Sequence, residues 1–316
     1  MPLYWIPIIV FVFFAVISIV ISYVFSGIVL YSIRQPIVIT PEKYGLVYED
    51  VAFKSTDGLT LKGWFIPAES AGERDKVVII THPFPFNRHG FLVKNQGWLP
   101  LFKTDVDLLQ IAPALHGAGY SVLMFDFRNH GESEGGMTGV GLTEYQDVLG
   151  AISYIKDHPS LRAPQIGFIS FCMGANSTIV ALSKGGELVE DIKFLVAVQP
   201  ISVSVFFRRY MSNVYTPLSL YLIPIVDRFV QWRGGFAFKE MSPLTYAKDV
   251  KVPALVIQAR EDPWFEASDV EGVYNAMKGP KEMWWIEGKM RRFEAYNHVC
   301  KNPERIIAFS REHFAG

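Results

Sequence analysis

The sequence predicts an α/β fold with a mostly parallel, doubly wound sheet, preceded by one transmembrane helix. Two observations carry this prediction. Apolar runs of strand length alternate with segments of helical periodicity through most of the chain, as expected for parallel strands joined by crossover helices. Residues 1–33 contain no charged side chain, and this stretch exceeds the roughly 20 apolar residues that span a bilayer.

The N-terminal segment, residues 1–34, is expected to be an uncleaved membrane anchor rather than a secretory signal, because it lacks a basic start and its apolar stretch is too long. Its length also argues against the alternative of a buried core helix. Arg34 and Lys43 follow the segment and nothing basic precedes it, which favours the cytoplasmic side for the rest of the chain. A linker over residues 35–43 then leads into one domain, residues 44–316.

Composition argues against a nucleic-acid-binding, a disulfide-rich and a metal-binding protein. The 316 residues have a net charge of −1, so no basic excess points to nucleic acid. Two cysteines do not make a disulfide framework and fit a reducing compartment. No metal is implied, since neither a His-x-x-His nor a Cys-x-x-Cys spacing occurs, and no cofactor is expected.

The elements follow from local patterns. A helical spacing of Leu149, Ile152 and Ile155 predicts a crossover helix over residues 143–157. The expected strands are 48–53 and 59–66, which form an opening hairpin, and the runs 76–81, 119–126, 165–169, 192–198, 252–258 and 282–287.

Residues 200–239 form an apolar, aromatic insertion that is broken by Pro224 and Arg228. Two interpretations compete: a cap folded over a lipophilic substrate, or an ordinary packed pair of helices. We prefer the cap, because the nearby anchor would bring it to the membrane surface.

The most informative stretch is 165–176, where an apolar strand breaks into a tight turn followed by small residues. Cys172 lies at the apex of that turn. A strand-turn-helix of this kind lifts one side chain above the sheet, with the helix N-terminus beneath it. The alternative is a structural cysteine, since free Cys usually packs as a small hydrophobe.

Two motifs in this chain resemble those of the α/β-hydrolase superfamily. Ser170-Phe171-Cys172-Met173-Gly174 is similar to G-x-S-x-G, with Ser170 in place of the first Gly and a thiol in place of Ser, as in the dienelactone-hydrolase branch. Asp126-Phe127-Arg128-Asn129-His130-Gly131-Glu132-Ser133 resembles D-x-R-G-x-G-x-S, whose polar members brace a loop. The resemblance covers nearly all of residues 44–316 and implies an α/β-hydrolase fold with the cap insertion at 200–239.

The resemblance also implies positions for the oxyanion hole and the acid. By position, the backbone N–H groups of Phe84 and Met173 would hold the oxyanion. Pro83 replaces the usual Gly there, and the alternative is that the prolines only stiffen a surface loop. Asp262 follows the strand 252–258 and would orient the catalytic base, unless it belongs to a solvated turn.

The histidine that would act as the general base is missing from its expected position after the last strand. After the strand 282–287 the phrase G-x-x-H reads Gly288-Lys289-Met290-Arg291, and arginine cannot act as a general base. In one explanation a longer loop lets His298 reach the thiol, giving a Cys172–His298–Asp262 triad; otherwise His298 is a surface residue. In the other explanation Arg291 takes the base position, stabilises a thiolate, and leaves nothing to activate water.

These observations predict a membrane-anchored hydrolase that cleaves an ester, thioester or lactone through Cys172. Its expected partners are a lipophilic acyl substrate and the membrane. Cys300 adds a further hypothesis, a redox-sensitive pair with Cys172. The rival interpretation is a catalytically degenerate hydrolase fold that acts as a membrane-tethered binding or scaffold protein, motivated by Ser170, Pro83 and Arg291.

Overall fold

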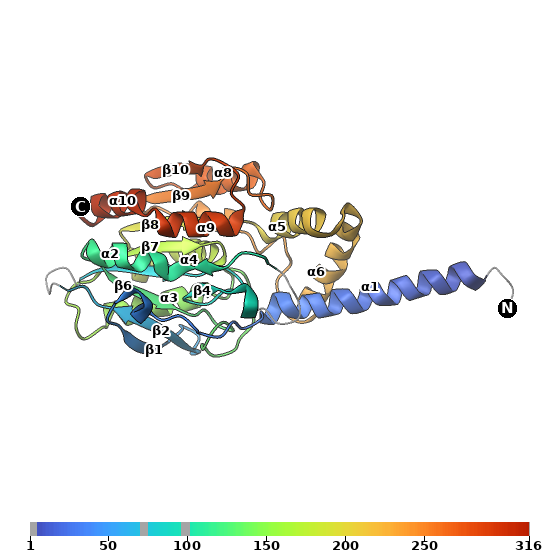
Figure 1. The fold of residues 1–316 in the computed structure, drawn as a ribbon, viewed down its shortest axis with the longest axis horizontal. Helices are drawn as coiled ribbons and strands as arrows, with labels where there is room; N and C mark the ends of the chain where they lie inside the picture. The colour runs from blue at the N-terminus through green and yellow to red at the C-terminus, as the bar shows by residue number, and fades with distance from the viewer. Residues whose placement is uncertain (1–4, 70–74, 96–101, 316) are drawn as a thin grey trace.

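The computed structural model describes residues 5–69, 75–95 and 102–315. An eight-stranded sheet in the order β1-β2-β6-β3-β7-β8-β9-β10 forms the centre of the domain (Figure 1). β1 and β2 pair antiparallel, as do β2 and β6, and the remaining neighbours are parallel. The strands are β1 Glu49–Lys54, β2 Thr60–Ile66, β3 Lys76–Thr81, β6 Ser121–Phe125, β7 Gln165–Phe171, β8 Phe194–Val198, β9 Ala254–Ala259 and β10 Lys281–Ile286.

Helices cover both faces of this sheet, which confirms the predicted doubly wound α/β fold. Alternating side chains of β3 show the division: Val78 and Ile80 pack with one set of helices, and Val77 and Ile79 pack with the other. The first set is α2 Ala112–Gly117, α9 Arg292–Lys301 and α10 Glu304–Ala315; the second is α3 Tyr145–Lys156, α4 Met173–Lys184, α7 Leu244–Ala247 and α8 Ala267–Ala276.

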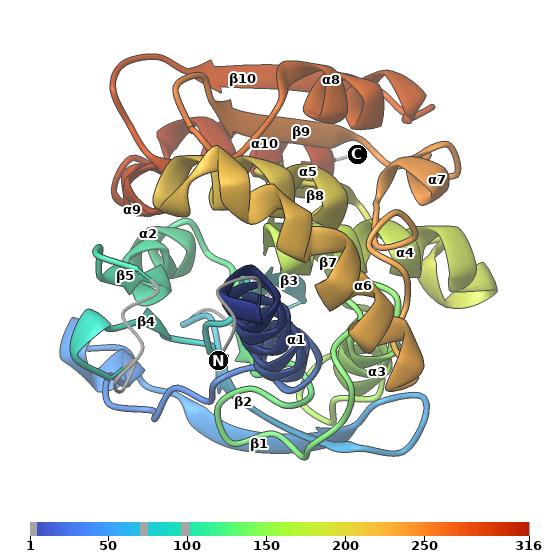
Figure 2. The same ribbon diagram turned by 90° about the vertical axis from the view of Figure 1, so that its right-hand side faces the viewer.

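A short hairpin, β4 Gly90–Phe91 and β5 Val106–Asp107, lies outside the main sheet. The segment between β8 and β9 contains α5 Val203–Tyr210, the π-helical turn Met211–Tyr215, the 3₁₀ turn Pro217–Leu222 and α6 Ile223–Trp232. Figure 1 places α5 and α6 beyond the end of the sheet, on the side from which the N-terminal helix projects, and Figure 2 shows α6 beside that helix.

The N-terminal helix α1 spans Trp5–Tyr31 and projects away from the domain (Figure 1). Its 27 residues are long and apolar enough to cross a membrane, with a mean hydropathy of 3.0 in the most apolar window. Most of its large side chains are exposed, but Val29 and Leu30 pack with Val226 and Val230 of α6 in a separate apolar cluster. The base of α1 is therefore part of the folded domain.

Candidate active site

Cys172 lies in a strained turn between β7 and α4. Its φ of +49° and ψ of −107° are unusual for a residue with a side chain, and such strain is typical of functional turns. The turn requires a glycine two residues later, because a Cβ on Gly174 would lie 2.4 Å from Thr81 Oγ1 and 2.7 Å from its carbonyl oxygen. The sequence fits the geometry of a nucleophile elbow at both positions.

Ser170 replaces the first glycine of the elbow motif without opening the turn. Its side chain is fully buried, and its Oγ lies 2.9 Å from Oγ1 of Thr178 on α4. The Thr178 hydroxyl also donates to the carbonyl oxygen of Gly174 at 2.9 Å. The substitution thus adds a hydrogen bond between the strand and the helix that follows the elbow.

Arg292, the first residue of α9, lies beside the Cys172 sulfur. Its Nη1 lies 3.5 Å from Sγ and donates to the Gln199 carbonyl oxygen at 3.0 Å. Its Nη2 lies 2.9 Å from Asp262 Oδ2, at an angle outside the hydrogen-bond range, so this contact is ionic. One guanidinium therefore bridges the thiol and the acid.

The charge of Arg292 is held in place by its surroundings. The side chain is only 1% exposed, and this burial, the largest single effect, lowers its pKa. The charge of Asp262, followed by the contributions of Tyr296 and Cys172, offsets burial and raises the pKa above its ordinary value. Asp262 is itself buried, and its Oδ1 accepts the Trp264 N–H at 3.0 Å. Arg292 consequently remains a cation and has no lone pair for a proton.

Tyr296 and Gln199 complete the surroundings of the guanidinium. The Tyr296 hydroxyl accepts from Arg292 Nη1 at 3.3 Å, and burial raises the pKa of Tyr296 well above its usual range, so the phenol stays neutral. The Gln199 side chain donates to the Arg292 carbonyl oxygen at 2.9 Å. These contacts fix both the backbone and the head group of Arg292.

The structure corrects the sequence-based assignment of His298. Residues 292–301 form α9 instead of an extended loop, and His298 lies six residues beyond Arg292, on a different face of the helix. Its Nδ1 is 3.3 Å from Asn302 Nδ2, and its ring lies 6.5 Å from that of Trp284. The position between Cys172 and Asp262 belongs to Arg292.

The structure also corrects Arg291, which is the N-cap residue of α9. Its side chain is exposed, and its backbone N–H donates to Glu294 Oε2 at 2.8 Å. The sequence contained a signal for its neighbour: Arg292, Ala295, Tyr296 and Val299 have the i, i+3, i+4, i+7 spacing of one buried helical face. An arginine on such a face is a strong candidate for an internal ion pair.

Cys300 does not pair with Cys172. Both thiols are free, and Cys300 lies on the buried face of α9, where burial raises the pKa of its thiol. The sulfur relevant to this site is therefore Cys172 alone.

The two expected oxyanion donors belong to the turn at Cys172 and to the loop after β3. Met173 is the first residue of α4, and the first amides of a helix have no intrahelical acceptor. Phe84, in the loop after β3, lines the same cavity as Cys172. Preceding it, His82 is fixed by two backbone contacts, because its Nε2 accepts the Phe127 N–H at 3.0 Å and its Nδ1 lies 2.9 Å from the Pro83 oxygen.

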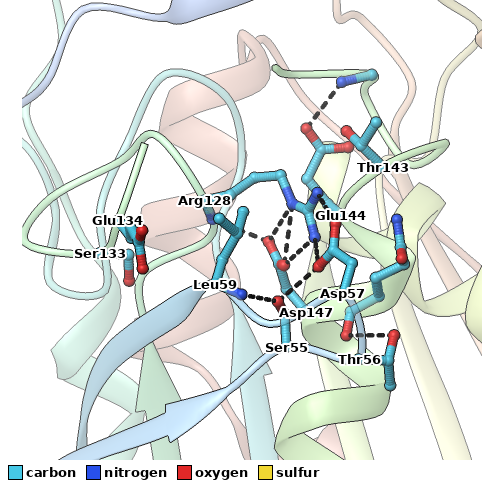
Figure 3. A network of polar contacts seen from close by, with 12 residues as sticks. Ser55, Thr56, Asp57, Leu59, Arg128, Ser133, Glu134, Thr143, Glu144 and Asp147 are labelled. Atoms are coloured by element: carbon cyan, nitrogen blue, oxygen red, sulfur yellow. Dashed lines mark hydrogen bonds and ion pairs between the residues drawn. The ribbon is translucent and has the colours of Figure 1, made fainter. Parts of the chain in front are cut away.

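A polar network supports the loop that borders the site (Figure 3). Arg128 lies between two carboxylates, with Nη2 2.7 Å from Asp147 Oδ1 and Nη1 2.8 Å from Asp57 Oδ2. Glu144, nearby, accepts the N–H groups of Gly139 and Gly141. Between these glycines, Val140 lines the Cys172 cavity, so the network shapes the cavity wall without contacting the sulfur.

The cavity above Cys172 is apolar and has a volume of about 90 Å³, room for several water molecules or part of a ligand. Cys172 and Arg292 lie together on its wall. Its other lining residues are Phe25, Ile28 and Val29 of α1, Phe84, Phe102, Val140, Ile201, Val203, Phe206, Phe207, Tyr210, Phe293 and Tyr296.

Comparisons with known proteins agree with this architecture. The esterase Pf2001 of Pyrococcus furiosus superposes with a TM-score of 0.65 at 27% identity, covering 89% of this chain and 98% of the esterase. The α/β hydrolase GrgF of Penicillium sp. superposes with a TM-score of 0.61 at 20% identity, covering 86% of this chain and all of GrgF. This chain has the α/β-hydrolase fold.

Sequence relatives extend the comparison. The polyketide transferase grgF of Penicillium sp. is 29% identical over 84% of this chain and 97% of its own length. The uncharacterized protein YqkD of Bacillus subtilis is 31% identical over 54% of this chain, and the match spans about half, 55%, of YqkD. No protein-family model matches the chain. Esterases and transferases on this fold support a hydrolase-type enzyme.

Proposed function

We propose that this α/β hydrolase is a membrane-anchored acyl-transfer enzyme, in which Cys172 accepts the acyl group of a lipophilic thioester. The single observation that carries the proposal is the position of Arg292, which bridges the Cys172 sulfur and Asp262 where a general base is expected. Asp262 acts through Arg292 as a positioning residue.

The first step is loss of the Cys172 proton to water, followed by attack of the thiolate sulfur on the acyl carbonyl carbon. Two positive groups stabilise the negative charge on the sulfur: the guanidinium of Arg292, 3.5 Å away, and the N-terminus of α4. The developing oxyanion accepts from the N–H groups of Phe84 and Met173. Collapse of this intermediate breaks the bond between the acyl carbon and the leaving atom, whose electron pair leaves with the donor.

Because Arg292 stands where a general base is expected, thioester donors are favoured over oxygen esters. Arg292 stays protonated, so it neither removes a proton from the attacking thiol nor returns one to a leaving group. A thioester needs no such proton, because one thiolate replaces another and the leaving thiol has an ordinary pKa near ~8.5. Alkoxide leaving groups are far more basic, so oxygen esters should react much more slowly.

The lack of a base also makes transfer of the acyl group to a thiol acceptor faster than its hydrolysis by water. Water must lose a proton as it attacks acyl-Cys172, and Arg292 cannot take it. An acceptor thiolate carries its own negative charge and removes the acyl group directly. The relatives named polyketide transferases support transfer of this kind, and the apolar cavity and the long apolar helix α1 support a lipophilic donor at a membrane.

Intact-mass measurements on the full chain in detergent micelles test the proposal. The donors are the octanoyl thioester of N-acetylcysteamine and its oxygen-ester counterpart. We expect one octanoyl group on wild type and on Cys300→Ala, none on Cys172→Ala, and slow labelling by the oxygen ester. The adduct should persist in buffer and disappear when N-acetylcysteamine is added.

Two results would overturn the proposal. Rapid hydrolysis without an adduct would require a base that Arg292 does not provide. A wild-type chain that accepts no acyl group would favour the rival function, a catalytically degenerate hydrolase fold that binds partners at a membrane, in which the Arg292–Asp262 pair only closes the site.

A further inference from the structure

The wall of the Cys172 cavity includes the N-terminal apolar helix. Phe25, Ile28 and Val29, on the last two turns of α1, line the cavity together with Cys172 and Arg292. Viewed end-on, α1 lies beside α6 and below α5 (Figure 2). The segment expected to cross the bilayer is therefore also part of the candidate active site.

A second apolar cavity, of about 200 Å³, adjoins the first along the same helix. The two cavities share Phe25 and Phe207, and the second reaches Ile21, one further turn along α1 away from the domain. Its remaining lining residues come from the α5–α6 segment and the loop after it: Met211, Ser219, Leu222, Ile223, Val226 and Phe238.

Contacts between α1 and the α5–α6 segment fix this second wall. Ser18 Oγ and Tyr221 Oη lie 2.8 Å apart, and Arg233 Nη1 donates to Ser26 Oγ at 3.1 Å. The Arg233 guanidinium also stacks over the Tyr23 ring at 4.9 Å. Ser18, Ser22 and Ser26 share one buried face of α1, and small residues of this kind let helices approach closely.

The polarity of the lining changes along the two cavities. Cys172 and the Arg292 cation lie at one end, and the lining is almost entirely apolar from there to Ile21. A ligand that fits has one polar, electrophilic end and an apolar tail. Ile28 and Ile21 are seven residues apart, so the tail region extends about 10 Å along α1. Extended chains gain about 1.2 Å per bond, which corresponds to roughly eight bonds.

We propose that the two cavities form one acyl-chain channel, which runs along α1 from the bilayer to Cys172 and selects donors by chain length. This inference rests on the proposed acyl transfer and adds the subsite that recognises the tail. The occupant is a single linear acyl chain, with its carbonyl carbon at Cys172 and its methyl end beside Ile21 and Val226.

The test compares acylation rates across chain lengths for full-length chains in phosphatidylcholine nanodiscs. The donors are butanoyl, octanoyl and dodecanoyl thioesters of N-acetylcysteamine, followed by intact mass. Ile21→Trp and Val226→Phe fill the channel from opposite walls. Val20→Trp is the matched control, because Val20 is the neighbour of Ile21 on α1 and does not line the channel.

We expect wild type and Val20→Trp to react faster with dodecanoyl than with butanoyl donor. Ile21→Trp and Val226→Phe should lose at least tenfold in rate with octanoyl and dodecanoyl donors and stay within twofold of wild type with butanoyl. If Ile21→Trp and Val226→Phe lost acylation rate equally with all three donors, the channel would be refuted. It would also be refuted if their dependence of rate on chain length matched that of Val20→Trp.

A binding measurement separates the channel from the acyl transfer. Dodecanamide carries no leaving group suited to a thiolate. Its binding to the Cys172→Ala variant in nanodiscs therefore measures occupancy of the channel without acylation. We expect Ile21→Trp, and not Val20→Trp, to weaken that binding at least tenfold. Weakened binding with no acylation by any donor would refute the proposed function and support the channel, whereas unchanged binding would refute the channel.

Discussion

The Arg292–Asp262 pair makes a stability prediction that does not depend on knowing the substrate. Arg292→Met removes the guanidinium and leaves the fully buried Asp262 carboxylate with the Trp264 N–H at 3.0 Å. Removing one member of a buried ion pair typically costs about 3–5 kcal/mol, because an uncompensated charge remains inside the protein. We expect a loss of that size in the free energy of unfolding.

Adding Asp262→Asn to Arg292→Met should restore part of that loss. The asparagine side chain still offers an acceptor to the Trp264 N–H and carries no charge. Groups in direct contact show coupling energies of about 0.5–3 kcal/mol, and the burial of both side chains places this pair toward the upper end. We expect the double variant to be about 2 kcal/mol more stable than Arg292→Met.

Urea denaturation of the full chain in detergent micelles, followed by tryptophan fluorescence, measures these differences. Arg291→Met is the control, because this neighbouring arginine is exposed and should change stability by less than about 0.5 kcal/mol. A double variant as unstable as Arg292→Met would refute the reasoning, since it would show that the loss comes from packing and not from an unpaired charge.

Three further predictions follow from the site and its supports. His298→Ala should leave acylation of Cys172 within twofold of wild type, because its ring contacts Trp284 and Asn302; a large drop in the intact-mass assay would contradict this. Gly174→Ala should destabilise the chain by more than about 2 kcal/mol and reduce acylation, since its Cβ would collide with the Thr81 backbone; thermal melts and labelling rates check both effects. Burial lowers the pKa of His130 to about 4 from an ordinary value near 6.5, so the unfolded chain binds a proton between these pH values that the folded chain does not. Stability should therefore fall as the pH drops from 6.5 toward 4, by about 3 kcal/mol from this residue, and denaturation curves of His130→Asn should show a shallower dependence.

Much of the fold could be predicted because its signals are local. The alternating apolar runs identified the strands of the sheet, and Gly174, two residues after Cys172, made the elbow recognisable despite Ser170. The charge-free N-terminal stretch likewise predicted one long apolar helix. Each of these features depends on residues close together in the sequence.

The base position could not be predicted in the same way, because it depends on where a strand ends and how the next helix is rotated. An error of one residue separates the exposed Arg291 from the buried Arg292. His298 was expected in a loop, whereas the start of α9 at Arg292 turned it to another face. The contact between α1 and the α5–α6 segment was also beyond local signals, since Ser18 and Tyr221 are 203 residues apart.

The part of α1 that lines the Cys172 cavity has a consequence for how this protein can be matured or engineered. An ordinary anchor can be exchanged for any hydrophobic helix, or removed to release a soluble domain. Here Phe25, Ile28 and Val29 would leave with it, and the cavity beside Cys172 would open to water. Cleavage of α1 as a signal sequence, or its replacement by an unrelated helix, would therefore remove a wall of the site.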